Sequence, residues 1–288
     1  MKNMQEKFFC IEPEIARKLL SQIKGMKAAK RGFDSQVYLI GEYAVLTTSR
    51  LKLRNVATCD DDLAYLDELI ETLMRLRNQG VSVVPILGYC YDSDSENGDG
   101  YIIQECAKGA ELYDDAIMKQ YYVRGRKNLA YLSSGADAKA YILARTCYIS
   151  QVPQAHFDKF IGDCITLLDN DILIDFMGKS NFFYDDTAGF QFIDLDSHTD
   201  YKYGLAEHKH DSREICAYNG FIPCHFTAGT RLLLDKKALK KIEKKESQQL
   251  AQDNQVIFEK CKTAMLNNAI PEEHLNGALK TFRLFGQK

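Results

Sequence analysis

The spacing of apolar and polar residues changes along this chain, and this change divides the chain into two halves. Residues 31–53, 81–91 and 100–107 are rich in Val, Ile, Tyr and Thr and are separated by polar turns or by a helical stretch, a pattern typical of β-strands. Residues 60–79 repeat Leu and Ile every three or four positions, which predicts an amphipathic helix. A polar helix is predicted ahead of them, at 11–29. The first half should therefore contain strands, then one helix, and then two further strands.

Helical spacing dominates the second half. Helices are predicted at 110–122, 137–149 and 153–169, and two or more follow later in the chain. Residues 173–196, LIDFMGKSNFFYDDTAGFQFIDLD, interrupt this pattern, because two apolar runs flank the turn DDTAG and predict a β-hairpin. The Lys-rich run at 234–252 is interpreted as the solvated face of a helix. Together these elements predict an α+β protein.

Composition narrows the class of protein further. The chain has 288 residues and a formal net charge of −3, so nothing suggests nucleic acid or an anionic membrane as a partner. No apolar run approaches the ~20 residues of a membrane span, and the N-terminus lacks the pattern of a signal peptide. The nine cysteines are scattered without a C-x-x-C, which argues against a disulfide framework or a structural zinc site. A cytoplasmic protein is expected.

The GKS at 178–180 is a poor match to a phosphate-binding P-loop. That motif requires a glycine five residues earlier, where this chain has Leu173. It also requires a helix to follow, so that the helix N-terminus faces the phosphates. NFFY follows instead and is typical of a strand, so a P-loop is rejected.

The polar residues around the predicted hairpin suggest different chemistry. The first residue of one antiparallel strand lies beside the last residue of its partner, so Asn181 and Asp194 should be neighbours, with Asp175 just ahead of them. An amide oxygen and a carboxylate are suitable ligands for Mg²⁺, together with substrate phosphates. A further carboxylate can orient or deprotonate a hydroxyl nucleophile. These are the groups that phosphoryl transfer requires.

With these residues in this order of elements, the chain resembles the protein-kinase-like superfamily, nearer to its small bacterial and aminoglycoside-phosphotransferase-like branches than to eukaryotic protein kinases. The match in element order covers roughly residues 31–196. The resemblance implies a bilobal α+β fold, with a small antiparallel-sheet N-lobe at 1–105, a hinge at 106–111 and a mostly helical C-lobe at 112–288. It also implies ATP and Mg²⁺ as cofactors.

The resemblance assigns roles to four residues near the hairpin. In the family's catalytic loop H-x-D-x-x-x-x-N, Asp175 matches the base and Asn181 the metal-binding Asn, with one extra residue between them. The family's metal motif matches the I-D-L-D of this chain. Asp194 would then be the principal Mg²⁺ ligand and Asp196 a weaker candidate.

Nucleotide-binding positions in the N-lobe follow from the same resemblance. Gly32 and Ser35 would belong to a shortened loop that covers the nucleotide. Glu68 or Glu71 would pair with the phosphate-binding lysine of the family. The hinge would meet adenine through the backbone of Gln104, Glu105 and Cys106.

The chain departs from the family at several positions. The third-strand lysine is replaced by Thr47, and Arg50 or Lys52, slightly later, would supply the cation. The His of the catalytic loop, the Gly of D-F-G and an A-P-E motif are absent. Two functions stay open: a phosphotransferase acting on a hydroxyl of a protein or small molecule, and a pseudokinase that binds nucleotide or a partner without turnover.

A third class rests on EHKHD at 207–211. His208 and His210 would share a face if this segment were a strand, and with Asp211 could bind a metal. A metal-dependent hydrolase would follow from such a site. The surrounding sequence is typical of a loop and offers no third ligand, so a surface loop is the preferred interpretation.

Overall fold

The computed structural model describes residues 4–31, 35–48, 59–92, 100–111, 143, 146–172, 174, 182–193, 195, 212–218 and 244–275. The chain divides into two compact units, Met1–Ala107 and Lys108–Lys288. The boundary between them falls within the segment 106–111 that was predicted to be a hinge.

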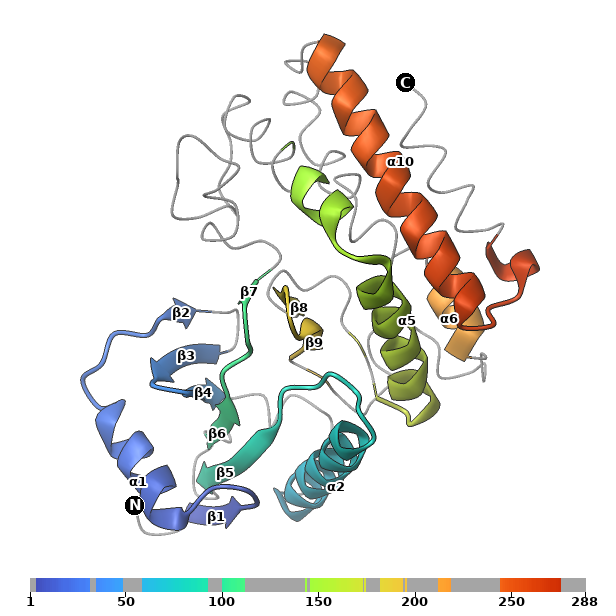
Figure 1. Cartoon of the computed structure of the whole chain (residues 1–288). Coiled ribbons are helices and arrows are strands. Elements are labelled where there is room, and N and C mark those ends of the chain that lie inside the picture. The colour runs from blue at the N-terminus through green and yellow to red at the C-terminus, as the bar shows by residue number, and fades with distance from the viewer. Residues whose placement is uncertain are drawn as a thin grey trace. The chain divides into compact units, whose positions relative to one another are not determined.

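The first unit is built on a six-stranded sheet in the order β1-β5-β6-β4-β3-β2, with every neighbouring pair antiparallel (Figure 1). Its strands are β1 (Met4–Phe8), β2 (Lys30–Arg31), β3 (Ser35–Ile40), β4 (Tyr43–Thr48), β5 (Ile86–Asp92) and β6 (Gly100–Glu105). Its helices are α1 (Pro13–Gln22) and α2 (Cys59–Asn78). The predicted order of strands, one helix and two strands is confirmed from β3 to β6.

The two helices cover opposite faces of this sheet. Val45 and Ile103 pack with the buried residues of α1, whereas Tyr89 packs with the buried residues of α2. Tyr89 pairs with Ile102, the neighbour of Ile103 on β6. Because successive residues of a strand point to opposite faces, the α1 and α2 clusters lie on opposite sides. The sheet is therefore the middle layer of the first unit.

Strand β1 was not predicted, and the structure explains why. Its sequence MQEKF carries two adjacent charges, which argue against a buried strand. Each charge has a partner on a helix: Glu6 accepts a 3.1 Å bond from Arg17 of α1, and the Lys7 amine lies 2.5 Å from Asp67 of α2. The following helix is also shorter than predicted.

The second unit contains a three-stranded antiparallel sheet in the order β7-β8-β9, formed by β7 (Ala110–Glu111), β8 (Phe182–Asp185) and β9 (Gly189–Phe192). Its helices are α5 (Gln154–Asp169), α6 (Ser212–Tyr218) and α10 (Lys244–Asn267), and α5 packs against β9, α6 and α10. The α+β class is confirmed, with an antiparallel sheet in the N-terminal unit and a mainly helical C-terminal unit. None of the helices among the described residues is long and apolar enough to cross a bilayer.

Three further predictions for this unit can be compared with the structure. The predicted helix at 110–122 is wrong at its start, because 110–111 form β7, and the rest lies outside the described residues. Residues 143 and 146–149 are helical, as predicted for 137–149. From the Lys-rich run, Lys244 and Lys245 open α10 and are exposed, in line with a solvated helix face.

Gly109 allows β7 to approach β8. Its φ is +75°, and a Cβ at this position would lie 2.1 Å from the carbonyl oxygen of Tyr184. We expect Gly109→Ala to destabilise the fold more than Gly25→Ala, because Gly25 shares a positive φ of +88° but a Cβ there would meet nothing within 4 Å. The left-handed conformation alone costs about 1–2 kcal/mol in either variant. Urea denaturation measures the difference, and equal losses would show that the β7–β8 contact is not tight.

Candidate functional site

The hairpin predicted around DDTAG is confirmed. Phe182 pairs with Phe192 at the open end, and Asp185 pairs with Gly189 at the tip. The Asp185 carboxylate closes the turn by accepting bonds from the amides of Thr187 (2.9 Å) and Ala188 (2.7 Å). The described part of the hairpin thus begins one residue after Asn181 and its second strand ends two residues before Asp194.

An aromatic cluster fixes the hairpin on α5. Phe182, Tyr184, Phe190 and Phe192 are buried and share the face of the hairpin that packs on this helix. Phe160 of α5 lies at their centre, with ring centroids 5.6 Å from Phe182, 5.2 Å from Phe190 and 5.1 Å from Phe192. Each such pair contributes about 0.5–1.5 kcal/mol beyond the area it buries. The open end of the hairpin therefore rests on a rigid support.

A polar contact holds the other end. The hydroxyl of Tyr184 lies 2.9 Å from Nδ1 of His156, near the start of α5. Burial, with smaller contributions from Asp186 and Asp185, raises the pKa of Tyr184 to about 12. The hydroxyl consequently stays protonated at neutral pH and acts as a hydrogen-bond partner that ties β8 to α5.

In the first unit, the predicted adenine-binding backbone lies at the end of β6. Gln104 is still paired with Ala44 of β4. The amide of Glu105 donates to the carbonyl of Pro85 (3.2 Å), and the amide of Cys106 donates to that of Glu42 (2.8 Å). Two of the three predicted amides are thus already used within the sheet. The next amide along the chain is that of Ala107, and it has no backbone partner among the described residues.

The sheet face beside this strand end is the face on which α2 packs at Tyr89, and over β4 it carries apolar side chains. Ala44 lies across from Gln104, and Leu46 lies across from Ile102. These residues point away from the α1 cluster, because Val45 between them belongs to it. Thr47, where the family's lysine was expected, lies two residues after Val45 in β4 and therefore points to the same face. Its hydroxyl accepts a bond from the amide of Gln36 (3.2 Å). Thr47 therefore lies on the face that α1 covers.

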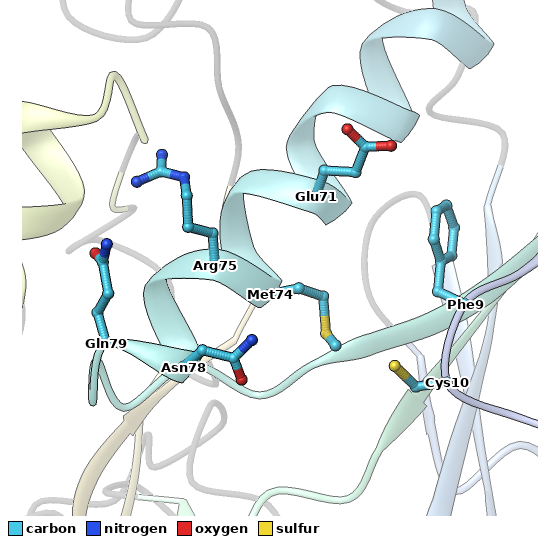
Figure 2. Close-up of a pocket in the computed structure, with 7 residues that line it drawn as sticks. All are labelled: Phe9, Cys10, Glu71, Met74, Arg75, Asn78 and Gln79. Atoms are coloured by element: carbon cyan, nitrogen blue, oxygen red, sulfur yellow. The ribbon is translucent and has the colours of Figure 1, made fainter.

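Glu68 and Glu71 are both exposed on α2. Glu71 lines a shallow hollow of about 600 Å³, whose opposite wall is formed by Phe9 and Cys10 just after β1 (Figure 2). In the order of the sheet, two strands separate β1 from β4. Glu71 thus faces the β1 edge of the sheet.

The acid of α2 that does bind a lysine is Asp67, which sequence analysis missed. It pairs with Lys7 and accepts a 3.0 Å bond from the hydroxyl of Tyr89. Burial and then this bond raise the pKa of Tyr89 well above its usual value of 10. Asp67 could have been found only with β1 recognised as a strand, since Lys7 reaches it from there.

The remaining predicted site residues lie outside the described residues: Gly32, Arg50, Lys52, Asp175, Asn181, Asp194, Asp196, His208, His210 and Asp211. Ser35 starts β3 and pairs with Thr48. Within the described ranges, no group of three or more His, Cys, Asp or Glu residues could hold a metal ion. The Mg²⁺ site stays a prediction.

Comparison with known proteins assigns no family. No family model matches the chain, and no curated protein matches its sequence. Among solved structures, the chain is similar to the Legionella pneumophila LegK7 effector kinase, with 10% sequence identity and a TM-score of 0.38. The match covers 93% of this chain and 66% of that one, so this chain spans just under two thirds of its length. A similarity of this degree does not assign a fold.

Proposed function

We propose that this chain is an ATP- and Mg²⁺-dependent phosphotransferase of the protein-kinase-like type, acting on a hydroxyl of a protein or small molecule. The observation that carries the proposal is the hairpin β8–β9. Its Phe182–Phe192 pair brings together the two chain segments that lead to Asn181 and Asp194. Side-by-side segments of this kind are what two ligands of one metal ion require.

The donor chemistry fits the proposed metal. A carboxylate from Asp194 and an amide oxygen from Asn181 are hard oxygen ligands, which suit Mg²⁺ better than they suit zinc. Asp196 is a weaker third candidate. Bound Mg²⁺ would neutralise charge on the phosphates of the nucleotide.

Other groups of the chain would act on the substrate. Asp175 would accept the proton of the attacking hydroxyl. Arg50 or Lys52 would neutralise phosphate charge. Positioning and electrostatic stabilisation would then supply most of the rate enhancement.

The base of the nucleotide would bind on the apolar face of the sheet at the end of β6. Ala44 is small enough to leave room for a planar ring, and Leu46 and Ile102 continue the apolar surface. Because the amides of Glu105 and Cys106 are already used, the amide of Ala107 is the donor proposed for adenine. Ser35 and Gly32 would cover the phosphates.

A pseudokinase is the second candidate, and the first unit offers an observation in its favour. Over Tyr43–Thr48, β4 contains no lysine or arginine. On the face proposed to bind the nucleotide, the residue that follows Ala44 is Leu46. Glu68 and Glu71 are exposed on α2, with Glu71 towards the β1 edge. The described residues thus lack the lysine–glutamate pair that active kinases use to hold the phosphates.

Nucleotide binding and turnover test the two candidates separately. ATP with Mg²⁺ at 100 times its Kd should stabilise the protein by about 2.7 kcal/mol and raise its Tm by roughly 5 °C. An active enzyme should also transfer the labelled γ-phosphate of ATP to an acceptor or to water, and Asp175→Ala should remove the transfer but keep the thermal shift. A shift without transfer in the wild-type protein supports the pseudokinase. Absence of any shift contradicts the phosphotransferase and a nucleotide-binding pseudokinase, and supports a pseudokinase that binds a partner instead.

A further inference from the structure

Helix α2 and the end of β6 are joined by a two-bond ion pair. Arg77, in the last turn of α2, donates through one guanidinium nitrogen to Oε1 of Glu105 (3.1 Å) and through the other to Oε2 (3.2 Å). Parallel bonds of this kind fix the orientation of both groups as well as their distance. Both side chains are about 40% exposed, so the pair is a modest source of stability.

Because of its position, this ion pair also restrains the backbone that follows β6. Glu105 is the last residue of β6, and its amide is held by the carbonyl of Pro85 just before β5. Cys106 is held in turn by Glu42, in the turn before β4. The segment that leads to the Ala107 amide is therefore fixed by two backbone bonds and by one side-chain contact from α2.

We propose that Arg77 is a positioning residue for nucleotide binding: through Glu105, it holds the backbone at 105–107 in the orientation that receives the base. This inference rests on the proposed function and adds that the position of α2 controls affinity for the base. If α2 moved away from the sheet, Glu105 would be released and the base would bind more weakly, although α2 itself would not contact the nucleotide.

The variants Arg77→Gln and Glu105→Gln test this role. Each should weaken ATP binding about threefold to fivefold, the range expected for a partly exposed ion pair. The double variant should weaken it no further than either single one, because both remove the same contact. Arg17→Gln, which breaks the exposed ion pair between α1 and Glu6 of β1, is the matched control and should bind ATP like the wild-type protein.

Inorganic tripolyphosphate separates positioning from general damage to the unit. It carries the phosphates without the base, so Arg77→Gln should bind it as tightly as the wild-type protein does. Equal weakening for ATP and tripolyphosphate, or unchanged affinity for ATP in Arg77→Gln, would overturn the inference while the proposed function stands. A wild-type protein that binds no ATP would overturn both.

Discussion

An Asp194→Asn variant is expected to lose phosphate transfer by about 10²-fold or more, while it unfolds at the same urea concentration as the wild-type protein. The amide has nearly the shape of the carboxylate but carries no charge, so it holds Mg²⁺ much less tightly. The measurement is transfer of labelled phosphate as a function of Mg²⁺ concentration. The variant's curve should shift to higher Mg²⁺ as well as fall in height.

The same hairpin offers a matched control. Asp186 is an exposed carboxylate in the turn at the tip of the hairpin, whereas Asp194 follows the open end of the hairpin in the sequence. Asp186→Asn makes the same chemical change and should leave transfer and its Mg²⁺ dependence unaltered. For a pseudokinase, the Mg²⁺ dependence of ATP binding replaces transfer as the readout. An Asp194→Asn protein that keeps the wild-type Mg²⁺ dependence in both measurements would end the assignment of this residue as a ligand.

Elements with a strong local signal were predictable from the sequence. Helices α2 and α5 carry apolar stripes at helical spacing, and their cores are the buried residues that those stripes contain. The hairpin β8–β9 was predictable because DDTAG separates two short apolar runs that are rich in aromatic residues. In each case the residues that determine the element are close together in the chain.

Features that depend on distant partners were not predictable. Strand β1 is stabilised by pairing with β5 and by ion pairs from Glu6 and Lys7, whose partners are 11 and 60 residues away. The amides of Glu105 and Cys106 are used by Pro85 and Glu42, which no local pattern indicates. The covering of one sheet face by α1, which removes Thr47 from the candidate site, follows only from the assembled sheet. The metal ligands Asn181 and Asp194 stay a prediction from the sequence motif and from the pairing of the hairpin strands that lead to them.

Phe160→Ala is expected to lower the free energy of unfolding by about 3–5 kcal/mol, the usual cost of removing a buried phenyl ring. The ring is 1% exposed and stacks on Phe192 at an interplanar angle of 10°. Removing it opens a cavity between α5 and the open end of the hairpin. Urea denaturation followed by far-ultraviolet circular dichroism measures the loss. Where that variant does not fold, Phe160→Leu removes less volume, should cost about 1.5 kcal/mol, and keeps the test quantitative.

Phe183→Ala provides the comparison, because Phe183 alternates with the inward residues and is only half-buried on β8. Loss of its ring should cost about 1 kcal/mol. The folded Phe160→Leu protein should also need more Mg²⁺ for ATP binding than the Phe183→Ala protein, since Phe160 packs on the hairpin face that faces α5, whereas Phe183 points to the other face of β8. Equal stability losses at the two positions would mean that α5 is not the support of the hairpin. Unequal stability with equal Mg²⁺ dependence would mean that the aromatic cluster stabilises the second unit without positioning a metal site.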